Sequence, residues 1–261
     1  MRTLAVIPAR YASTRFPGKP LALLGGRPII DYAYSVAAAT PGIDTAVVAT
    51  DDERIFAHVE QAFGKGSVMM TSTEHRSGTD RCGEVAQRLA QQGDRYDVVV
   101  NLQGDEPFVQ PEQLQRLVGS FADPAVDIAT LKTRIASSEE LFSPNNVKVV
   151  CAANGKALYF SRQPIPYRRG DEEQVWVVAG QYYKHVGIYA FRSQTLVEVC
   201  ALPQSRLEQS EKLEQLRWLE AGYSIAVCET PCANIGIDTP EDLRLAEEGL
   251  KHQTEKNIDS L

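Results

Sequence analysis

The chain has 261 residues, of which 43% are hydrophobic and 23% are charged. These proportions are ordinary for a soluble globular protein. The formal net charge of −7 argues against a general nucleic-acid binder, whose surface would be basic overall. An anionic small ligand is still compatible with this charge, because a local basic loop can bind it.

Neither the cysteines nor the N-terminus carries a strong signal. The chain has 5 cysteines, and only Cys228 and Cys232 lie close together, without the second Cys/His pair of a zinc site. We expect reduced thiols in or near the core. The apolar stretch Leu4–Pro8 is too short for a signal peptide or a membrane span, so we expect a cytoplasmic protein that does not act on membranes.

In its first half the chain alternates β-rich runs with helical stretches. Strands are predicted at Thr3–Pro8, Ala46–Thr50, Ser67–Thr71 and Asp97–Gln103, and helices at Pro28–Thr40, Asp52–Phe63 and Asp80–Gln92. The run Val98-Val99-Val100 has no polar alternation, as expected of a parallel strand covered on both faces. The pattern predicts an α/β fold with a doubly wound, mostly parallel, Rossmann-like sheet, in which ligands bind beyond the carboxyl ends of the strands.

The second half of the chain is less regular. Strands are predicted at Val126–Arg134, Val147–Val150 and Tyr182–Phe191, helices at Glu211–Ala221 and Pro240–Gly249, and an exposed excursion at Gln163–Gln174. We expect a single domain over residues 1–261. Residues 1–125 would form its nucleotide-binding core, and residues 126–250 a smaller mixed α+β part for substrate binding and dimerisation.

The segment Pro8–Pro20 follows the first predicted strand. It contains three cations, two hydroxyls and a glycine in about a dozen positions. A triphosphate needs this mixture of mobile positive charge, side-chain donors and closely approaching backbone. The segment lacks the Walker A spacing, and the chain lacks the dinucleotide fingerprint, which argues against a nicotinamide-dependent oxidoreductase. Phosphate binding at a strand end is favoured over a solvated basic loop.

The run PARYASTRFPGKPL closely resembles the opening signature of the 3-deoxy-manno-octulosonate (KDO) cytidylyltransferases, or CMP-KDO synthetases. Shorter forms of the signature occur across nucleotidyltransferases, including the sialic acid cytidylyltransferases. The resemblance continues in order from near Leu4 to about Leu245. It implies a fold like that of the nucleotide-diphospho-sugar transferases, with CTP as a substrate. It further implies that the CTP phosphates are held by Arg10, Ser13, Arg15 and Lys19.

Two aspartates lie in loops that are far apart in the sequence. Asp105 follows the most strand-like run and comes after Gly104, which permits a close approach by a ligand. Asp238 precedes a predicted helix that has Thr239 as N-cap and Pro240 at its first position. From the residues alone, a functional role is favoured for Asp105 and capping for Asp238. The motifs LQGDEP and GIDTPEDL resemble the two metal-binding motifs of the family, which implies that both aspartates bind Mg²⁺, a cation with a preference for oxygen ligands.

The motif His75–Arg81 lies between the third predicted strand and a helix. Its donors and backbone amides suit a nucleotide, and it resembles the motif that this family places near the cytidine. By this resemblance Arg76 and Ser77 contact the base. Thr79 or Asp80 can also cap the helix that follows.

KDO is an anionic, polyhydroxylated acid sugar, so its site should combine an arginine with several hydrogen-bonding groups. The motifs SRQPIPY, YKHVGIY and LEQLR contain such groups and resemble second-half motifs of the family. From the residues alone, His185 is interpreted as a satisfied strand histidine and Glu214 as an exposed helix acid. The resemblance implies a sugar pocket lined by Gln103, Arg162, His185, Tyr189, Glu214 and Gln215.

By resemblance, the chain joins CMP to KDO, releases pyrophosphate, acts as a homodimer and serves lipopolysaccharide synthesis. In-line attack of the C2 hydroxyl on the α-phosphorus depends on positioning and charge neutralisation. We expect catalysis to depend on Lys19, Arg10, Arg15, Asp105 and Asp238, and no general base is evident. The alternatives are a cytidylyltransferase for 8-amino-KDO or sialic acid, and a non-catalytic CTP sensor. Both metal-binding aspartates and the sugar motifs are present, which argues against the sensor.

Overall fold

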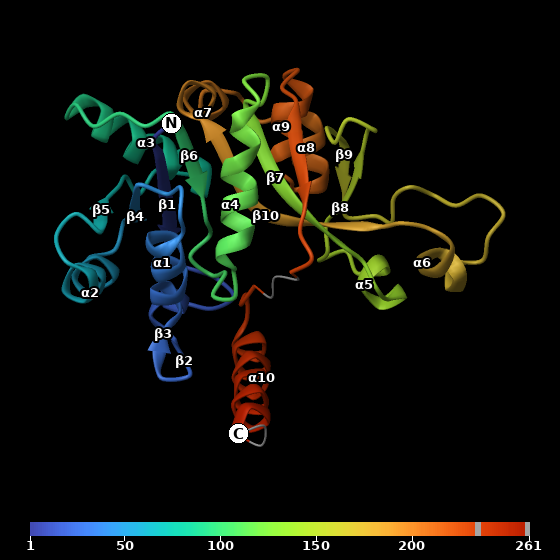
Figure 1. Cartoon of the computed structure of the whole chain (residues 1–261), viewed down its shortest axis with the longest axis horizontal. Helices are drawn as coiled ribbons and strands as arrows, with labels where there is room; N and C mark the ends of the chain where they lie inside the picture. The colour runs from blue at the N-terminus through green and yellow to red at the C-terminus, as the bar shows by residue number, and fades with distance from the viewer. Residues whose placement is uncertain (233–235, 259–261) are drawn as a thin grey trace. The chain divides into compact units, whose positions relative to one another are not determined.

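The structure is a computed structural model and describes residues 1–232 and 236–258, with the side chains of the last helix described as far as Leu250 (Figure 1). The chain forms two compact units. The first comprises Met1–Glu112 with Asn234–Leu261, and the second comprises Gln113–Ala233. We expected a division near residue 125 and placed the segment up to residue 250 in the later part. The last helix instead belongs to the first unit.

The first unit is built on a parallel sheet with the strand order β6-β1-β4-β5. Its strands are β1 (Thr3–Ala9), β4 (Thr45–Thr50), β5 (Val68–Met70) and β6 (Val98–Asn101). β1 is central, and Val6 pairs with Val47 on one side and with Asn101 on the other. β1 is buried at every position, which explains its apolar run. The predicted parallel sheet is confirmed.

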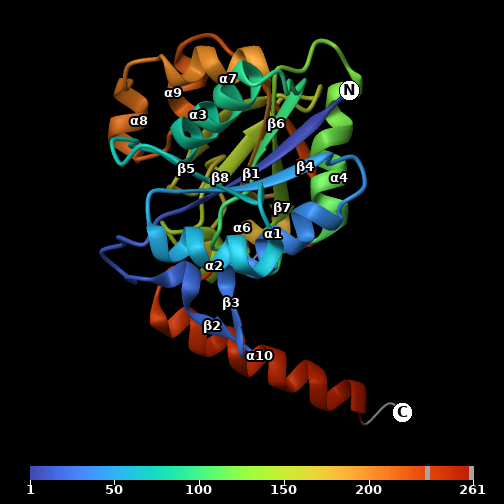
Figure 2. The same ribbon diagram turned by 90° about the vertical axis from the view of Figure 1, so that its left-hand side faces the viewer.

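Three helices follow strands of this sheet: α1 (Ile29–Ala39), α2 (Glu53–Phe63) and α3 (Gly78–Gln91). The chain passes outward from β1 through β4 to β5, and then returns to β6 on the other side of β1. Because such crossovers are right-handed, this reversal places α1 and α2 on one face and α3 on the other (Figure 2). The carboxyl ends of β1 and β6 therefore flank the switch point of the sheet, where open α/β sheets bind ligands.

The starts of α2 and α3 are fixed by side-chain caps. The carboxylate of Asp52 accepts a hydrogen bond from the amide of Arg54 at 3.0 Å. At α3, Ser77 is the N-cap, and Asp80 completes a capping box with it. The prediction of Thr79 or Asp80 as the cap was wrong, because the helix begins earlier than its apolar pattern indicates and Asp80 is the reciprocal partner.

The last helix packs on the segment that ends and follows residues 8–20, the predicted phosphate loop. This segment contains the 3₁₀ turn η1 (Lys19–Leu21) and the short antiparallel strands β2 (Leu23–Leu24) and β3 (Arg27–Pro28). α10 (Pro240–Ile258) covers it. The contact is a hydrophobic cluster of Leu24, Ile29, Ile237 and Ala246, with Phe16, Ala22, Tyr32, Phe108, Leu243 and Leu250 packed against it. The residues just before α10 are thereby held beside the phosphate loop.

The second unit has a mixed sheet, as expected for this part of the chain. β7 (Ile128–Arg134) pairs in parallel with β11 (Ile225–Glu229) and antiparallel with β10 (Tyr183–Arg192). β10 also pairs with β8 (Lys148–Cys151), which pairs with β9 (Ala157–Ser161). β9 and β11 are absent from the sequence prediction.

The remaining helical segments are short. They are α4 (Pro111–Gly119), η2 (Ser120–Ala122), α5 (Ser138–Phe142), η3 (Glu173–Val175), α6 (Trp176–Ala179), α7 (Ser193–Cys200), α8 (Arg206–Glu211) and α9 (Gln215–Glu220). The predicted single helix over Glu211–Ala221 was wrong, because Lys212 adopts a left-handed conformation with φ of 55° and ends α8. The excursion at Gln163–Gln174 is largely exposed, as predicted. All five cysteines are free thiols. In the described part of the chain, no helix is both long and apolar enough to cross a membrane.

Candidate active site

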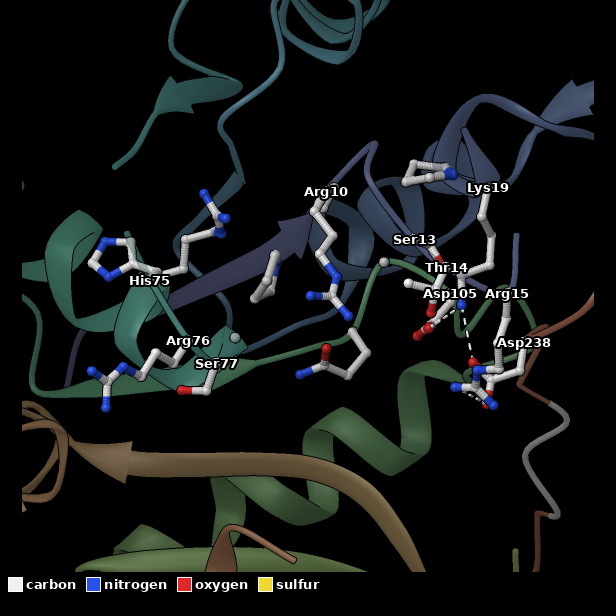
Figure 3. Close-up of a pocket in the computed structure, with 17 residues that line it drawn as sticks. Arg10, Ser13, Thr14, Arg15, Lys19, His75, Arg76, Ser77, Asp105 and Asp238 are labelled. Carbon is white, nitrogen blue, oxygen red and sulfur yellow. Dashed lines mark hydrogen bonds and ion pairs between the residues drawn. The ribbon is translucent and has the colours of Figure 1, made fainter. Parts of the chain in front are cut away.

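A polar cavity lies at the carboxyl ends of β1 and β6 (Figure 3). Four segments of the first unit contribute to it: the loop after β1, the start of α3, the loop after β6 and Asp238, two residues before α10. The polar residues that line it are Arg10, Ser13, Thr14, Arg15, Lys19, His75, Arg76, Ser77, Arg81, Gln103, Asp105 and Asp238. Every residue that we predicted for phosphate, base and metal binding is among them.

At one end of the cavity, Lys19 joins the two aspartates. Its Nζ lies 2.6 Å from Oδ2 of Asp105 and 3.1 Å from Oδ1 of Asp238. Nη2 of Arg15 lies 3.2 Å from the other carboxylate oxygen of Asp238. The Lys19 side chain is 11% exposed, so solvent screens its ion pairs only in part. The fold thus brings two loops that are distant in the sequence to the ammonium group of Lys19 (Figure 3).

This pair of carboxylates fits a magnesium ion. Both aspartates direct a carboxylate oxygen at Nζ of Lys19, and a divalent cation at that position would meet the same oxygens. Among the described residues there is no group of three or more His, Cys, Asp and Glu placed to hold a metal. An ion held here would complete its coordination with water or phosphate oxygens, as Mg²⁺ typically does.

Asp238 does not cap α10, contrary to the interpretation from the residues alone. The amide of Asp242 donates to Oγ1 of Thr239 at 3.2 Å, and Oδ2 of Asp242 accepts from the amides of Thr239 and Asp238. Thr239 is therefore the cap, as predicted, and Asp242 is its partner. The carboxylate of Asp238 faces the cavity.

Gly104 is required for packing as well as for access. A Cβ added to it would lie 2.9 Å from Cδ1 of Ile30 and 3.0 Å from the carbonyl oxygen of Pro8. Its amide donates to that carbonyl at 3.3 Å. The glycine allows the loop after β6 to press against the end of β1, and this contact keeps Asp105 close to Lys19.

The other end of the cavity is formed by the loop before α3. Nε2 of His75 lies 2.5 Å from Oε2 of Glu84, which also accepts from the amide of Ser72. Although partial burial opposes it, these hydrogen bonds hold the pKa of Glu84 below its ordinary value. Arg81 is buried and donates to Oγ1 of Thr71 and to Oδ2 of Asp51, each at 2.7 Å. Internal bonds thus fix the loop that contains Arg76 and Ser77.

Sequence reasoning did not select Thr14, His75 or Arg81 as site residues. Each lies within a motif that we quoted, so the signal was the motif itself. Thr14 lines the cavity, whereas the buried Arg81 also fixes the loop before α3.

Five of the six predicted sugar residues belong to the second unit, and the sixth, Gln103, lines the cavity of the first. In the second unit, His185 and Tyr189 lie on β10 with their ring centroids 5.2 Å apart. Nε2 of His185 is 2.9 Å from Oγ1 of Thr130. Burial lowers the pKa of His185 from 6.5 to about 3, so its imidazole is neutral at physiological pH.

Tyr189 and the start of α9 also lie close together. Burial, and then the negative charge of Glu214, raises the pKa of Tyr189 well above its ordinary value. Gln215 is only 4% exposed. Arg162, at the end of β9, donates from Nε to the carbonyl of Glu211 at 2.7 Å and from Nη1 to the carbonyl of Pro144. Its guanidinium thus already has backbone partners within the unit.

The chain resembles known proteins over nearly its whole length. A family model described as cytidylyltransferase matches residues 4–225. A 3-deoxy-manno-octulosonate cytidylyltransferase of Bacteroides thetaiotaomicron is 52% identical, and the match covers 97% of this chain and 100% of the relative. One of Thermodesulfovibrio yellowstonii is 47% identical over 96% of this chain and 98% of the relative.

Solved structures give a consistent result. A CMP:2-keto-3-deoxy-manno-octonic acid synthetase complexed with CTP has a TM-score of 0.87 and 42% identity, and covers 97% of this chain and 100% of its own. A 4-diphosphocytidyl-2C-methyl-D-erythritol synthase has a TM-score of 0.63 at 15% identity, with 96% of this chain and 100% of its own covered. The second likeness concerns the fold alone.

Proposed function

The chain belongs to the cytidylyltransferase family, among the 3-deoxy-manno-octulosonate cytidylyltransferases, and from this premise we propose that it joins CMP to KDO. The reaction consumes CTP and releases pyrophosphate. The observation that carries the proposal is the cavity at the strand switch point, where Lys19 meets Asp105 and Asp238. The synthetase complexed with CTP, 42% identical to this chain, supports CTP as the nucleotide.

In the proposed reaction, the C2 hydroxyl of KDO loses its proton to water and its oxygen bonds to the α-phosphorus of CTP. The bond from that phosphorus to the oxygen bridging the β-phosphorus breaks, and pyrophosphate leaves. The protein has little covalent chemistry to perform, so positioning and charge neutralisation carry the catalysis. Arg10, Arg15 and Lys19 would offset the charge on the phosphates, and Ser13 would donate from its hydroxyl.

A magnesium ion would be held by Asp105 and Asp238 and would supply charge neutralisation at the phosphates. Lys19 would then exchange its bonds to these two carboxylates for bonds to phosphate oxygens. The support for this assignment is the pairing of both carboxylates around one cation in the present structure. Arg76 and Ser77, at the far end of the cavity from this pair, would contact the cytosine.

For the sugar, we propose Gln103, Arg162, His185, Tyr189, Glu214 and Gln215 as ligands. Support within the second unit comes from the closeness of His185, Tyr189 and Glu214. The neutral imidazole and the protonated phenol can bond to sugar hydroxyls without adding charge. We further propose that the enzyme acts in the cytoplasm, as a homodimer, and supplies CMP-KDO for lipopolysaccharide assembly.

The experiment is pyrophosphate release by the purified protein with Mg²⁺, testing each of the four nucleoside triphosphates in turn. KDO, 8-amino-KDO and sialic acid serve as acceptors. We expect release with CTP and KDO. Release with another acceptor alone would contradict the assigned sugar, and CTP binding without release for any acceptor would contradict the assigned reaction.

A further inference from the structure

The backbone carbonyl of Tyr11 ties the phosphate loop together. It accepts hydrogen bonds from the amide of Ser13 at 3.1 Å and from the amide of Gly18 at 2.9 Å. The cavity-lining residues are arranged around this point, with Arg10 immediately before Tyr11 and Lys19 immediately after Gly18. The position of Tyr11 therefore sets the backbone positions from which the side chains of Arg10 and Lys19 extend.

The ring of Tyr11 is fixed by two contacts. A Cβ added to Gly18 would lie 3.0 Å from Cζ of the ring, so the glycine, which has a φ of 73°, allows the loop to close against it. The guanidinium carbon of Arg54 lies 3.3 Å from the ring centroid. Such stacking is favourable because the face of the ring is negative.

Arg54 is itself held in a fixed orientation. Its Nε and Nη2 donate to the two carboxylate oxygens of Asp52 at 3.0 Å and 2.7 Å. Asp52 is the N-cap of α2, and its amide donates to Oγ1 of Thr50 at the end of β4. A continuous set of contacts thus runs from the sheet, through Asp52 and Arg54, to the ring of Tyr11.

We propose that Arg54 is a positioning residue for CTP binding, which acts by holding Tyr11 and through it the phosphate loop. Neither Arg54 nor Tyr11 lines the cavity, so their effect on the nucleotide passes through the loop. The inference rests on the proposed function, because it takes CTP as the ligand of that loop.

The chain contains a matched control in Arg2. Its guanidinium carbon lies 4.5 Å from the ring centroid of Tyr96, and its Nη1 pairs with Asp94 at 2.7 Å. The same three residue types thus form the same kind of contact beside the start of β1, whereas the phosphate loop follows the end of this strand. Arg2→Met removes an equivalent interaction without disturbing the loop.

The test is the dissociation constant of CTP with Mg²⁺, measured by calorimetry. We expect Arg54→Met and Tyr11→Leu each to weaken binding about 2- to 5-fold, which corresponds to the strength of an exposed cation–π contact. Tyr11→Leu keeps the charge of Arg54, so its effect reports the ring contact. Tyr11→Phe, which keeps the ring, and Arg2→Met should bind CTP like the wild type. The KM for KDO should not change in any of these variants.

The double variant Arg54→Met/Tyr11→Leu distinguishes positioning from direct contact. If Arg54 acts through Tyr11, the dissociation constant of CTP for the double variant is no higher than that of the single variant with the higher dissociation constant. If the losses of CTP affinity in the two single variants multiply in the double variant, Arg54 acts on the nucleotide directly. If Arg54→Met binds CTP with wild-type affinity, Arg54 has no role in CTP binding. Either result overturns the proposal. Failure of the wild-type protein to bind CTP would overturn the proposed function itself.

Discussion

At the scale of single residues, the defining arrangement is one ammonium group between two carboxylates. Lys19 and Arg15 together neutralise Asp105 and Asp238 within the protein, and these four side chains are suited to receive a triphosphate and its cation. Because the charges of the carboxylates are already balanced, binding the nucleotide with a divalent ion requires an exchange of partners and introduces no unpaired charge.

The role of the two carboxylates can be tested by removing their charge. Asp105→Asn and Asp238→Asn should each lower kcat by about 100-fold or more in saturating Mg²⁺, since an amide is a poorer ligand for a hard cation. Glu241→Gln is the matched control, because this carboxylate lies near Asp238 in the sequence but pairs with Arg244 at the surface. Full activity in both aspartate variants would contradict the assignment.

His185 makes a separate prediction for stability against pH. Its pKa is about 3 in the folded protein and near 6.5 when exposed, so between these values the unfolded chain binds more protons. The stabilisation is complete above pH 6.5 and is lost as the pH falls from there toward 3, by up to about 1.4 kcal/mol per unit.

Urea denaturation at pH 7 and pH 5 measures this contribution. The free energy of unfolding of the wild type should fall about 2 kcal/mol more than that of His185→Gln over this interval. Equal losses in the two proteins would contradict the buried, neutral histidine.

At the scale of elements, α10 links stability to the site. Its residues Leu243 and Ala246 pack against Leu24 and Ile29, and the helix begins two residues after Asp238. Docking of this helix therefore sets the position of one of the two proposed metal ligands.

Two leucines of α10 provide a matched test of this docking. Leu243→Ala should lower the free energy of unfolding by about 1–3 kcal/mol and reduce activity, because Leu243 packs into the cluster. Leu245→Ala should cost under about 0.5 kcal/mol, because Leu245 is 53% exposed. Similar losses in the two variants, measured by denaturation and by pyrophosphate release, would show that docking does not depend on this cluster.

The elements also show which features the sequence could predict. β1, β4 and β6 were predictable because buried parallel strands are continuous apolar runs. The short strands β9 and β11 were missed although each begins with four apolar residues, because an apolar run this short does not distinguish a strand from a buried helical segment. The break between α8 and α9 depends on Lys212 in a left-handed conformation. This conformation is uncommon for residues other than glycine, so the residue type does not predict it. Ser77 as the cap of α3 was missed because the motif offered several capping residues.

At the scale of the whole molecule, an acidic chain presents a locally cationic loop to its ligand. The net charge of −7 did not predict an anion-binding loop, whereas the position of that loop at a strand end did. The convergence of Asp105 with Asp238 depends on the docking of α10, a contact between distant parts of the chain that neither motif encodes alone. The resemblance to a family supplied that pairing before the structure did.

The proposed homodimer is also a property of the whole molecule. Tyr167 and Val178 in the second unit are 75% and 89% exposed, which is unusual for large apolar side chains and supports an interface there. We expect the wild type to sediment at twice the mass of the chain and Val178→Asp to shift toward monomer. Val197→Asp, at a valine of α7 that is 37% exposed, is the control. A monomeric wild type would contradict the proposal.

The most direct test of the central claim is phosphorus NMR of CTP and KDO with the protein and Mg²⁺. We predict that the three CTP resonances decay together while one phosphodiester resonance and pyrophosphate appear in equal amounts, and that Asp105→Asn slows this conversion by about 100-fold or more. Formation of inorganic phosphate in place of pyrophosphate, or no new phosphodiester although CTP is bound, would contradict transfer of CMP to the sugar.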